Sequence, residues 1–518
     1  MSTQQQRITI FNIKTISDID TFIDHFKTDK ISQVYLNETR LKQIITLLGL
    51  NISVVIEESY NDKVYNDTYY HHYSSKFNTP LKKSKRLSFF KTSDISKDQF
   101  YSKEGHKKLQ DTFIGILVLR PLSKVSIGRT LFNPKQIDTL KSCHIRTTNF
   151  EVVIIGVSLN IEAFPFSSQD GEVMTCAETT IWGLLEYYGT RYPEYKTVLP
   201  SEITNSVSKR AFERVVPSIG LSYYQNSQTL KDFGFAPKIY SRFNGGTNIF
   251  EDNDFKRFFH YYIESGIPFT TSISLEKANK KEGHAIVCVG HSSKRDLSVP
   301  AAHNNGIYIN DSSEFYDKYI FMDDNNSPYT TYKFDDFDYY KQVSSKKYDK
   351  TTIKSFIVPL YKRIHLDSSN ASKIIYKILL NDKIGISKSI NDFPEYSVDN
   401  PIVVRIFLTS SRRYKIYASL NHKEQLKPLY TQRDYPKFIW VGEITTKKLY
   451  QEEKILGEII LDATSYSTET NYLDSIISIH FLNQITNKTK YGSIEELIRG
   501  FKDIKNKNAY SMYKHNLK

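Results

Sequence analysis

The stretch SSQDGEVMTCAETTIWGLLEYYG, residues Ser167–Gly189, decides how this sequence is interpreted. Its TCAE segment has the pattern of a capping box, in which Thr175 is the N-cap and the side chain of Glu178 reaches back to it. Apolar residues then recur at intervals of three and four, which predicts a helix with one apolar face: Ile181, Leu184, Leu185 and Tyr188. We expect this helix to begin at Cys176 and to end at Gly189, a residue suited to a left-handed C-cap.

Cys176 is predicted to be the first residue of that helix. A helix start carries partial positive charge and unpaired N–H groups, and both favour a thiolate over a thiol. The thiolate is the nucleophilic form of cysteine, so this position suits a reactive residue. Cysteine is also a common small hydrophobic residue of protein cores. Helix position alone therefore leaves a catalytic and a structural role open for Cys176.

The chain has two other cysteines, and neither has a comparable context. Cys288 lies inside the apolar run AIVCVG and is predicted to be a core residue. Cys143, in KSCHIR, has no capping pattern and is predicted to be structural. An odd number of cysteines without CxxC spacing argues against a disulfide framework and against a cysteine zinc site. We expect neither a metal nor a cofactor.

A cysteine nucleophile needs a base, and one histidine stands in a suitable context. In KEGHAIVCVGH (Lys281–His291), Gly283 comes directly before His284 and an apolar run follows it. His284 is therefore predicted to lie at the mouth of a buried strand, beside a glycine that permits close approach. His291 closes the same strand and is the alternative base.

The next short strand, YIFM (Tyr319–Met322), is followed by acidic and amide residues. Asp323 is the first polar residue after the strand, and we predict that it orients the imidazole of His284. Asp324 and Asn325 follow it and are alternatives for the same role. Aspartate and asparagine are also frequent in turns for purely structural reasons, so this segment is not decisive alone.

Taken in order, these segments resemble the papain-like cysteine peptidases. The likeness is closest to the bacterial branch related to bacteriocin-processing and other double-glycine-type peptidases, and it extends over about residues 165–335. The resemblance implies an α+β fold with a papain-like core, in which the cysteine helix packs on an antiparallel sheet. It also implies a peptidase or isopeptidase that cleaves a peptide or amide bond through a thioester intermediate.

The family places a glutamine before the nucleophile, and its side-chain amide helps to form the oxyanion hole. Here Gln169 stands seven residues before Cys176, whereas the family usually has six, and Asp170 holds that position. A long insertion, His291–Gly306, also separates the histidine strand from the next one. The resemblance implies the following catalytic residues: Cys176 as nucleophile, His284 as base, Asp323 as orienting acid and Gln169 as oxyanion donor.

Other functions share these residue types. Transglutaminases, peptidoglycan amidases, deamidases and arylamine acetyltransferases use the same triad, so acyl transfer and deamidation are alternatives to hydrolysis. A third alternative is a scaffold without catalytic activity that binds peptide or nucleic acid. The net charge of +13 allows a nucleic-acid partner. No zinc finger, helix-turn-helix or RNA-binding motif supports one, so we expect a protein or peptide substrate.

The remaining sequence predicts regions on either side of the core. Residues 1–165 mix helix and strand patterns and suit an α/β region for recognition or regulation, 166–360 form the peptidase-like core, and 361–518 are β-rich. Within the first region, the polar segment Tyr60–Arg86 predicts a long loop, and Phe150–Phe166 predicts a strand.

The first residues, MSTQQQRITIF, contain no basic segment that leads into a long apolar one, so no secretory signal is predicted. No stretch approaches the roughly 20 apolar residues that a membrane helix needs. The cysteine content fits a reducing compartment. We therefore expect a protein of the cytoplasm, and the resemblance to the bacterial peptidase branch implies a bacterial origin.

Overall fold

The computed structural model describes residues 8–27, 38–122, 127–211, 213–216, 218, 220–244, 247–278, 280–486, 492–504 and 508–517. The fold is mixed α+β and divides into two compact units, each made of segments that are not adjacent in sequence. The first unit consists of Met1–Ile239, Pro268–Gly290 and Lys318–Ile357, and the second of Tyr240–Ile267, His291–Asp317 and Val358–Lys518. The region boundaries predicted after residues 165 and 360 stay predictions.

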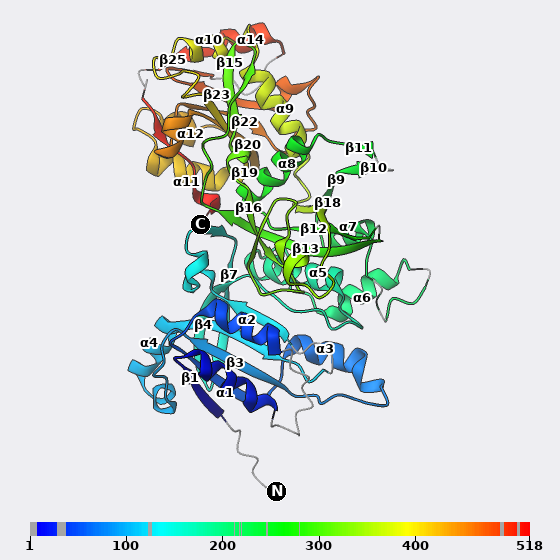
Figure 1. Ribbon diagram of the computed structural model, residues 1–518. Helices are drawn as coiled ribbons and strands as arrows, with labels where there is room; N and C mark the ends of the chain where they lie inside the picture. The colour runs from blue at the N-terminus through cyan, green and yellow to red at the C-terminus, as the bar shows by residue number, and fades with distance from the viewer. Residues whose placement is uncertain are drawn as a thin grey trace. The chain divides into compact units, whose positions relative to one another are not determined.

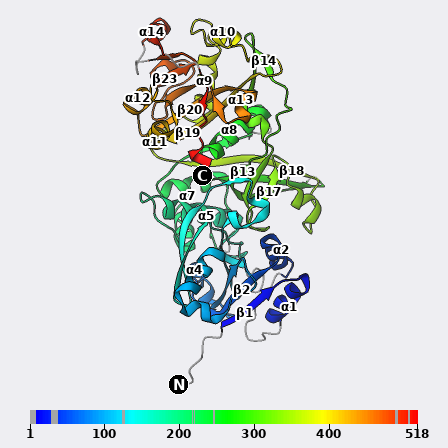
Figure 2. The same cartoon turned by 90° about the vertical axis from the view of Figure 1, so that its left-hand side faces the viewer.

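An antiparallel sheet forms the N-terminal part of the first unit (Figure 1). Its strands are neighbours in sequence order: β1 (Ile8–Ile13), β2 (Ile52–Tyr60), β3 (Ser84–Phe90), β4 (Phe113–Leu119) and β5 (Ile127–Phe132). The accompanying helices are α1 (Ile16–Lys27), α2 (Glu38–Leu48), α3 (Lys63–His71) and α4 (Lys103–Thr112). Helices α1 and α2 lie on one face of this sheet and α4 on the other (Figure 2). Both faces are thus covered, which explains why β4 is apolar along its whole length.

The segment Tyr60–Arg86, predicted as a loop, instead contains α3 and the first residues of β3. The side chain of Asp62 caps α3 by accepting a hydrogen bond from the backbone N–H of Tyr65, at 2.8 Å. Val64 and Tyr65 are buried. The prediction was wrong because the segment is polar in composition. Its helix obtains an apolar face from the rings of tyrosine residues.

The segment Phe150–Phe166 was predicted as one strand and folds as a hairpin of β7 (Thr148–Ile154) and β8 (Val157–Ala163). Ile155 and Gly156 connect the strands with φ angles of 48° and 83°. Two consecutive positive φ angles are the geometry of a tight type I′ turn. The turn was overlooked because isoleucine rarely adopts this conformation.

Helix α5 (Cys176–Arg191) begins where the capping box predicted. The backbone N–H of Thr175 donates to the carboxylate of Glu178 at 3.2 Å. The predicted end at Gly189 is wrong, because the helix continues beyond it. A Cβ atom at Gly189 would lie 2.3 Å from the backbone nitrogen of Thr197. Gly189 therefore allows a neighbouring segment to approach the helix closely, and it does not end the helix.

A second sheet carries the strands that the motifs predicted. Its order is β17-β16-β13-β12-β18-β9, and β6 also pairs with β13. The bounds are β6 (Cys143–Ile145), β9 (Ala236–Ser241), β12 (Phe269–Lys277), β13 (Lys280–Ser292), β16 (Lys318–Met322), β17 (Thr330–Lys333) and β18 (Lys350–Leu360). Helices α6 (Pro200–Ser208) and α7 (Tyr223–Asp232) lie between α5 and β9 in the chain. The strands predicted from GHAIV and YIFM are thus β13 and β16, which are neighbours.

The second unit contains a mixed sheet in the order β14-β15-β19-β20-β22-β23-β24-β25. Its strands are β14 (Ala302–Asn304), β15 (Ile307–Asp311), β19 (Ile402–Ser410), β20 (Phe438–Thr446), β22 (Gly457–Asp462), β23 (Ile476–Phe481), β24 (Gln484–Thr486) and β25 (Phe501–Asp503). β15 pairs with β19 in parallel, and β19 pairs with β20 antiparallel. The helices of this unit are α8 (Asp252–Glu264), α9 (Ser368–Leu379), α10 (Ile386–Asn391), α11 (Ser411–Asn421), α12 (Lys427–Thr431), α13 (Lys447–Gln451) and α14 (Ile494–Arg499). Within the described residues, no helix has both the length and the apolar character to cross a membrane.

Candidate active site

The first turn of α5 is attached directly to β13. The hydroxyl group of Thr180, one turn after Cys176, donates to the carbonyl of Cys176 at 2.6 Å and lies 3.2 Å from the carbonyl oxygen of Ala285. Ala285 is the strand residue next to His284. An interaction with the Cys176 side chain is among the causes that raise the pKa of His284, and Cys176 is partly exposed. The structure therefore brings the predicted nucleophile and the predicted base together.

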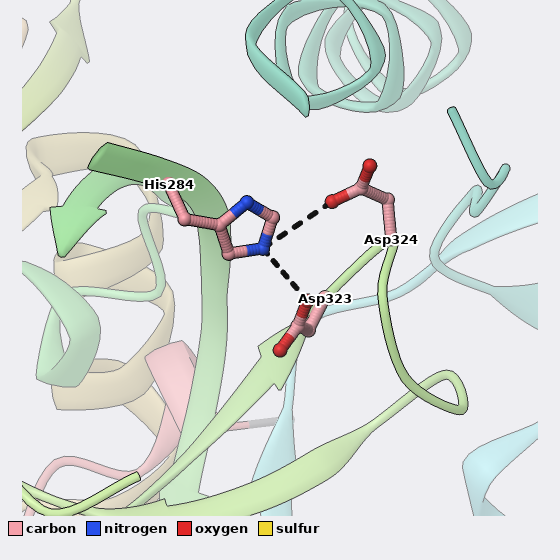
Figure 3. Close-up of side chains that lie close together, drawn as sticks. All are labelled: His284, Asp323 and Asp324. Atoms are coloured by element: carbon pink, nitrogen blue, oxygen red, sulfur yellow. Dashed lines mark hydrogen bonds and ion pairs between the residues drawn. The ribbon is translucent and has the colours of Figure 1, made fainter. Parts of the chain in front are cut away.

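The His284 ring points from β13 to the turn after β16 (Figure 3). Its Nε2 atom lies 2.9 Å from Oδ1 of Asp323, which is fully buried, with 0% of its surface exposed. An ionised carboxylate can only accept, so Nε2–H of His284 is the donor. This leaves Nδ1 as the ring nitrogen for the Cys176 thiol. The contact is the one predicted for Asp323.

Asp323 is surrounded by hydrogen-bond donors. Its Oδ1 accepts from the backbone N–H of Asn325 at 3.0 Å, and its Oδ2 accepts from the Tyr332 hydroxyl at 2.8 Å. The hydroxyl of Tyr340 lies 2.9 Å from both oxygens. Burial alone would raise the pKa of Asp323, but His284 and these donors hold the pKa below its ordinary value. Neither tyrosine could be predicted from the sequence, since both follow the turn without a motif.

The same contacts keep the imidazole charged. Burial alone would lower the pKa of His284. The charge and hydrogen bond of Asp323, the hydrogen bond with Cys176 and the charge of Asp324 together raise the pKa well above its ordinary value. A histidine held in one orientation beside a cysteine is the arrangement that a cysteine nucleophile requires.

The two alternatives for the acid are also close to His284. Oδ1 of Asp324 lies 3.4 Å from Nε2, and the side-chain nitrogen of Asn325 lies 3.4 Å from the same atom. Asp324 is 4% exposed, and neither of its carboxylate oxygens accepts a hydrogen bond from a described residue. Burial, together with the charge of Asp323, raises the pKa of Asp324 to about 6. His284 therefore makes its hydrogen bond with Asp323 and interacts with Asp324 through charge.

Gln169 reaches the same turn from the loop before α5. Its side-chain nitrogen donates to Oδ1 of Asn325 at 2.8 Å. Asp170 holds the position where the family has its glutamine, but its side chain turns into the loop. Oδ1 of Asp170 accepts the backbone N–H groups of three following residues at 2.8–2.9 Å: Glu172, Val173 and Met174. The loop geometry therefore places Gln169, and not Asp170, beside the histidine turn.

Two arginines from the N-terminal region support the site, and the sequence analysis missed both. Arg40 on α2 donates to the backbone carbonyls of Asp324 and Asn326, the latter at 2.6 Å. Arg120 donates to the carbonyl of Ser168 at 3.0 Å, within the loop before α5. Arg40 and Asp324 are 284 residues apart in the chain, so no local pattern could have connected them.

The histidine and the two aspartates also have the spacing of a possible metal site. His284, Asp323 and Asp324 each have one ligand atom, and these atoms lie within 4.8 Å of one another. The oxygens of Asp323 already accept hydrogen bonds from tyrosine hydroxyls, and Nε2 of His284 is bonded to Asp323 through its proton. The positive charge of Arg40 also acts on Asp324. These contacts suit a hydrogen-bonded acid–base pair better than a divalent cation.

The remaining predicted residues have other surroundings. Cys288 is fully buried, as predicted, and burial raises the pKa of its thiol. Cys143 is partly exposed on β6, and burial raises its pKa as well. His291 lies in the second unit, where its Nε2 is 3.0 Å from Oε2 of Glu264. A Cβ atom at Gly283 would meet no described atom within 4 Å, so the close approach predicted there is not found.

Comparisons with known proteins do not identify this site. No protein-family model matches the chain, and the curated proteins contain no significant match to it.

Proposed function

We propose that the chain is a papain-like cysteine peptidase or isopeptidase, which cleaves a peptide or amide bond in a protein or peptide. One observation carries the proposal: Nε2 of His284 lies 2.9 Å from the Asp323 carboxylate, and the side chain of Cys176, at the start of α5, interacts with the same histidine. Nucleophile, base and orienting acid joined by hydrogen bonds are the parts of a nucleophilic triad. The attachment of α5 to an antiparallel sheet through Thr180 also fits a papain-like core.

In the first step, the Cys176 thiolate attacks the carbonyl carbon of the scissile bond. A C–S bond forms, and the carbonyl oxygen takes the negative charge. The backbone N–H of Cys176 and the side-chain amide of Gln169 are the donors for this oxyanion. An amide nitrogen carries two hydrogens, so the bond from Gln169 to Asn325 leaves one for the substrate. One such donor contributes roughly 10²–10³ in rate.

His284 moves the protons in both halves of the reaction. The imidazolium gives its proton to the leaving amine, the C–N bond breaks, and a thioester to Cys176 remains. Water then attacks the thioester while the neutral imidazole takes the proton of the water. The acid product leaves, and the thiolate–imidazolium pair is restored. Asp323 holds the ring in one orientation throughout and stabilises its charged form.

The test is Cys176→Ala in the full chain, reacted with a peptide that carries a thiol-reactive group at the position of the scissile carbonyl. We expect wild type to form a covalent adduct at neutral pH and the variant to lose at least about 90% of it, because the thiolate is the nucleophile. Intact mass spectrometry measures the adduct. Cys143→Ala is the matched control, since Cys143 is also partly exposed, and it should keep full labelling.

Two outcomes would contradict the proposal. One is equal labelling of wild type and a folded Cys176→Ala variant. The other is labelling that depends on Cys143 instead. Circular dichroism of each variant establishes that the fold is retained before the labelling is compared.

A further inference from the structure

We infer that Asp324 is a second acid of this site: it helps Asp323 to keep His284 charged, and Arg40 positions the turn that carries both acids. Asp324 acts through His284, so it is a positioning residue. The inference rests on the proposed function, because the charge of His284 matters for reactivity only if Cys176 is the nucleophile.

The first argument is the arrangement around one nitrogen atom. Both carboxylates face Nε2 of His284 (Figure 3), Asp323 at 2.9 Å and Asp324 at 3.4 Å. One N–H group makes one good hydrogen bond, and here that bond goes to Asp323. The interaction with Asp324 is therefore between charges, and it is strong because both side chains are buried.

The second argument is that turn formation does not explain Asp324. Aspartate stabilises a turn when its side chain accepts a nearby backbone N–H, as Asp323 does from Asn325 at 3.0 Å. Neither carboxylate oxygen of Asp324 accepts a hydrogen bond of ordinary geometry from a described residue, although Asp324 is 4% exposed. A buried carboxylate without donors costs folding free energy. Asp324 lowers the stability of the fold and lies 3.4 Å from His284, and this combination fits an electrostatic role.

The third argument is the placement of Arg40. It is 8% exposed, and its guanidinium donates to the backbone carbonyls of Asp324 and Asn326. Both bonds come from Nη2, so one nitrogen joins two carbonyls of the same turn and limits the movement of that turn. Its positive charge also acts on the carboxylates of Asp324 and Asp323. Arg40 therefore fixes the direction of both acids and balances part of their charge.

The groups that face His284 come from several elements. Among the described residues they include Cys176 of α5, Asp323 and Asp324 of the turn after β16, Tyr339 and Tyr340 of the helical turn η6 (Tyr339–Val343), and Arg40 of α2 through the two acids. Burial raises the pKa of Tyr339 and Tyr340 above the ordinary tyrosine value, so both stay neutral near pH 7.

The test is the pH dependence of Cys176 alkylation by iodoacetate, measured on the full chain. Iodoacetate is an anion, so its reaction slows when the imidazolium beside the thiolate loses its proton. The alkaline limb of the rate profile thus reports the pKa of His284. In Asp324→Asn this limb should move down by about one pH unit, because one negative charge beside the imidazolium is gone.

Arg40→Gln should move the limb in the opposite direction, by about half a pH unit, because it removes a positive charge from the same cluster. Arg40→Lys keeps the positive charge beside the two acids, so it should keep the limb near its wild-type position. Glu282→Gln is the matched control. Glu282 lies two residues before His284 but is exposed and paired with Lys346, so its removal should leave the limb unchanged.

The outcomes separate the inference from the proposed function. An unchanged limb in Asp324→Asn overturns the second-acid role, while alkylation of wild type at Cys176 still supports the proposed function. A limb that falls in Arg40→Gln, as it does in Asp324→Asn, overturns the role of Arg40. If wild type shows no reaction that depends on Cys176, the proposed function fails, and the inference fails with it.

Discussion

The neighbouring residues Asp323 and Asp324 have the same side chain, but the structure gives them very different surroundings. Asp323 accepts hydrogen bonds from two tyrosine hydroxyls and a backbone N–H, and its pKa is lowered. Asp324 has no such donors among the described residues, and its pKa is raised to about 6. Strand direction favoured Asp323 as the residue that bonds His284, but it could not predict that Asp324 would also be buried beside the ring.

This difference predicts opposite effects of two identical substitutions. The pKa of Asp324 rises on folding from 3.8 to about 6, so its ionisation costs stability above pH 6 and costs nothing below pH 3.8. Two pKa units correspond to roughly 3 kcal/mol. Asp324→Asn should therefore raise the free energy of unfolding at pH 8, by about 1–3 kcal/mol, and much less near pH 4.

Asp323→Asn should do the reverse. The pKa of Asp323 falls on folding, so its charged form stabilises the fold above the ordinary pKa of 3.8, and this stability is lost as the pH falls through the folded-state pKa. The variant should lose stability at pH 8. Urea denaturation at pH 4 and pH 8 measures both variants. If Asp324→Asn also loses stability at pH 8, the carboxylate of Asp324 has a structural role that its contacts do not indicate.

At the scale of elements, neighbouring residues determine where α5 begins, but they do not determine where it ends. The helix begins at Cys176 because Thr175 and Glu178 form a capping box within four residues of each other. Its end is not determined in this way. Gly189 has the residue type of a C-cap, yet the backbone of Lys196 and Thr197 packs against it, and the helix continues to Arg191.

Gly189→Ala should destabilise the protein for this reason. A Cβ atom there would lie 2.3 Å from the backbone nitrogen of Thr197, and a backbone segment cannot rotate away as a side chain can. Overpacking of this kind costs about 1–3 kcal/mol, which exceeds the gain of roughly 1 kcal/mol from better helix propensity.

Gly183→Ala in the same helix is the matched control. Its Cβ would lie 3.2 Å from the carbonyl oxygen of Pro165, so a small adjustment suffices and the propensity gain should offset the cost. Thermal denaturation followed by circular dichroism compares the two variants. A melting temperature of Gly189→Ala equal to that of wild type would show that residues 196–197 yield more easily than the packing indicates.

At the scale of the whole molecule, the chain leaves and re-enters each compact unit. The insertion His291–Gly306, which departs from the family pattern, lies in the segment His291–Asp317 of the second unit, whereas β13 before this segment and β16 after it carry the candidate site of the first. The second unit has its own buried charge centre. There Arg405 of β19 lies 2.5 Å from Glu264 of α8 and 2.6 Å from Glu443 of β20.

Arg405→Met should destabilise the protein by about 3–5 kcal/mol, because it removes the arginine that both buried carboxylates share. Arg405 is 1% exposed, so water cannot replace the lost charge. Lys454→Met, which removes an exposed pair with Glu452, is the control and should cost less than about 1 kcal/mol. Guanidinium denaturation gives both values.

The candidate site lies in the first unit, so Cys176 should keep its alkylation rate in Arg405→Met under conditions where the variant is folded. A large fall in that rate, without unfolding, would mean that the stability of the second unit controls the site.

The sequence by itself determined the α+β class, the start of α5 at Cys176, and the strands β13 and β16 that carry His284 and precede Asp323. These features follow from capping, strand length and apolar runs, which act over a few neighbouring residues. Only the tertiary structure decided that Arg40 holds the acidic turn and that tyrosine hydroxyls surround Asp323. Such contacts join distant segments, and the burial that shifts each pKa depends on every layer packed around the site, so neither leaves a pattern in the local sequence.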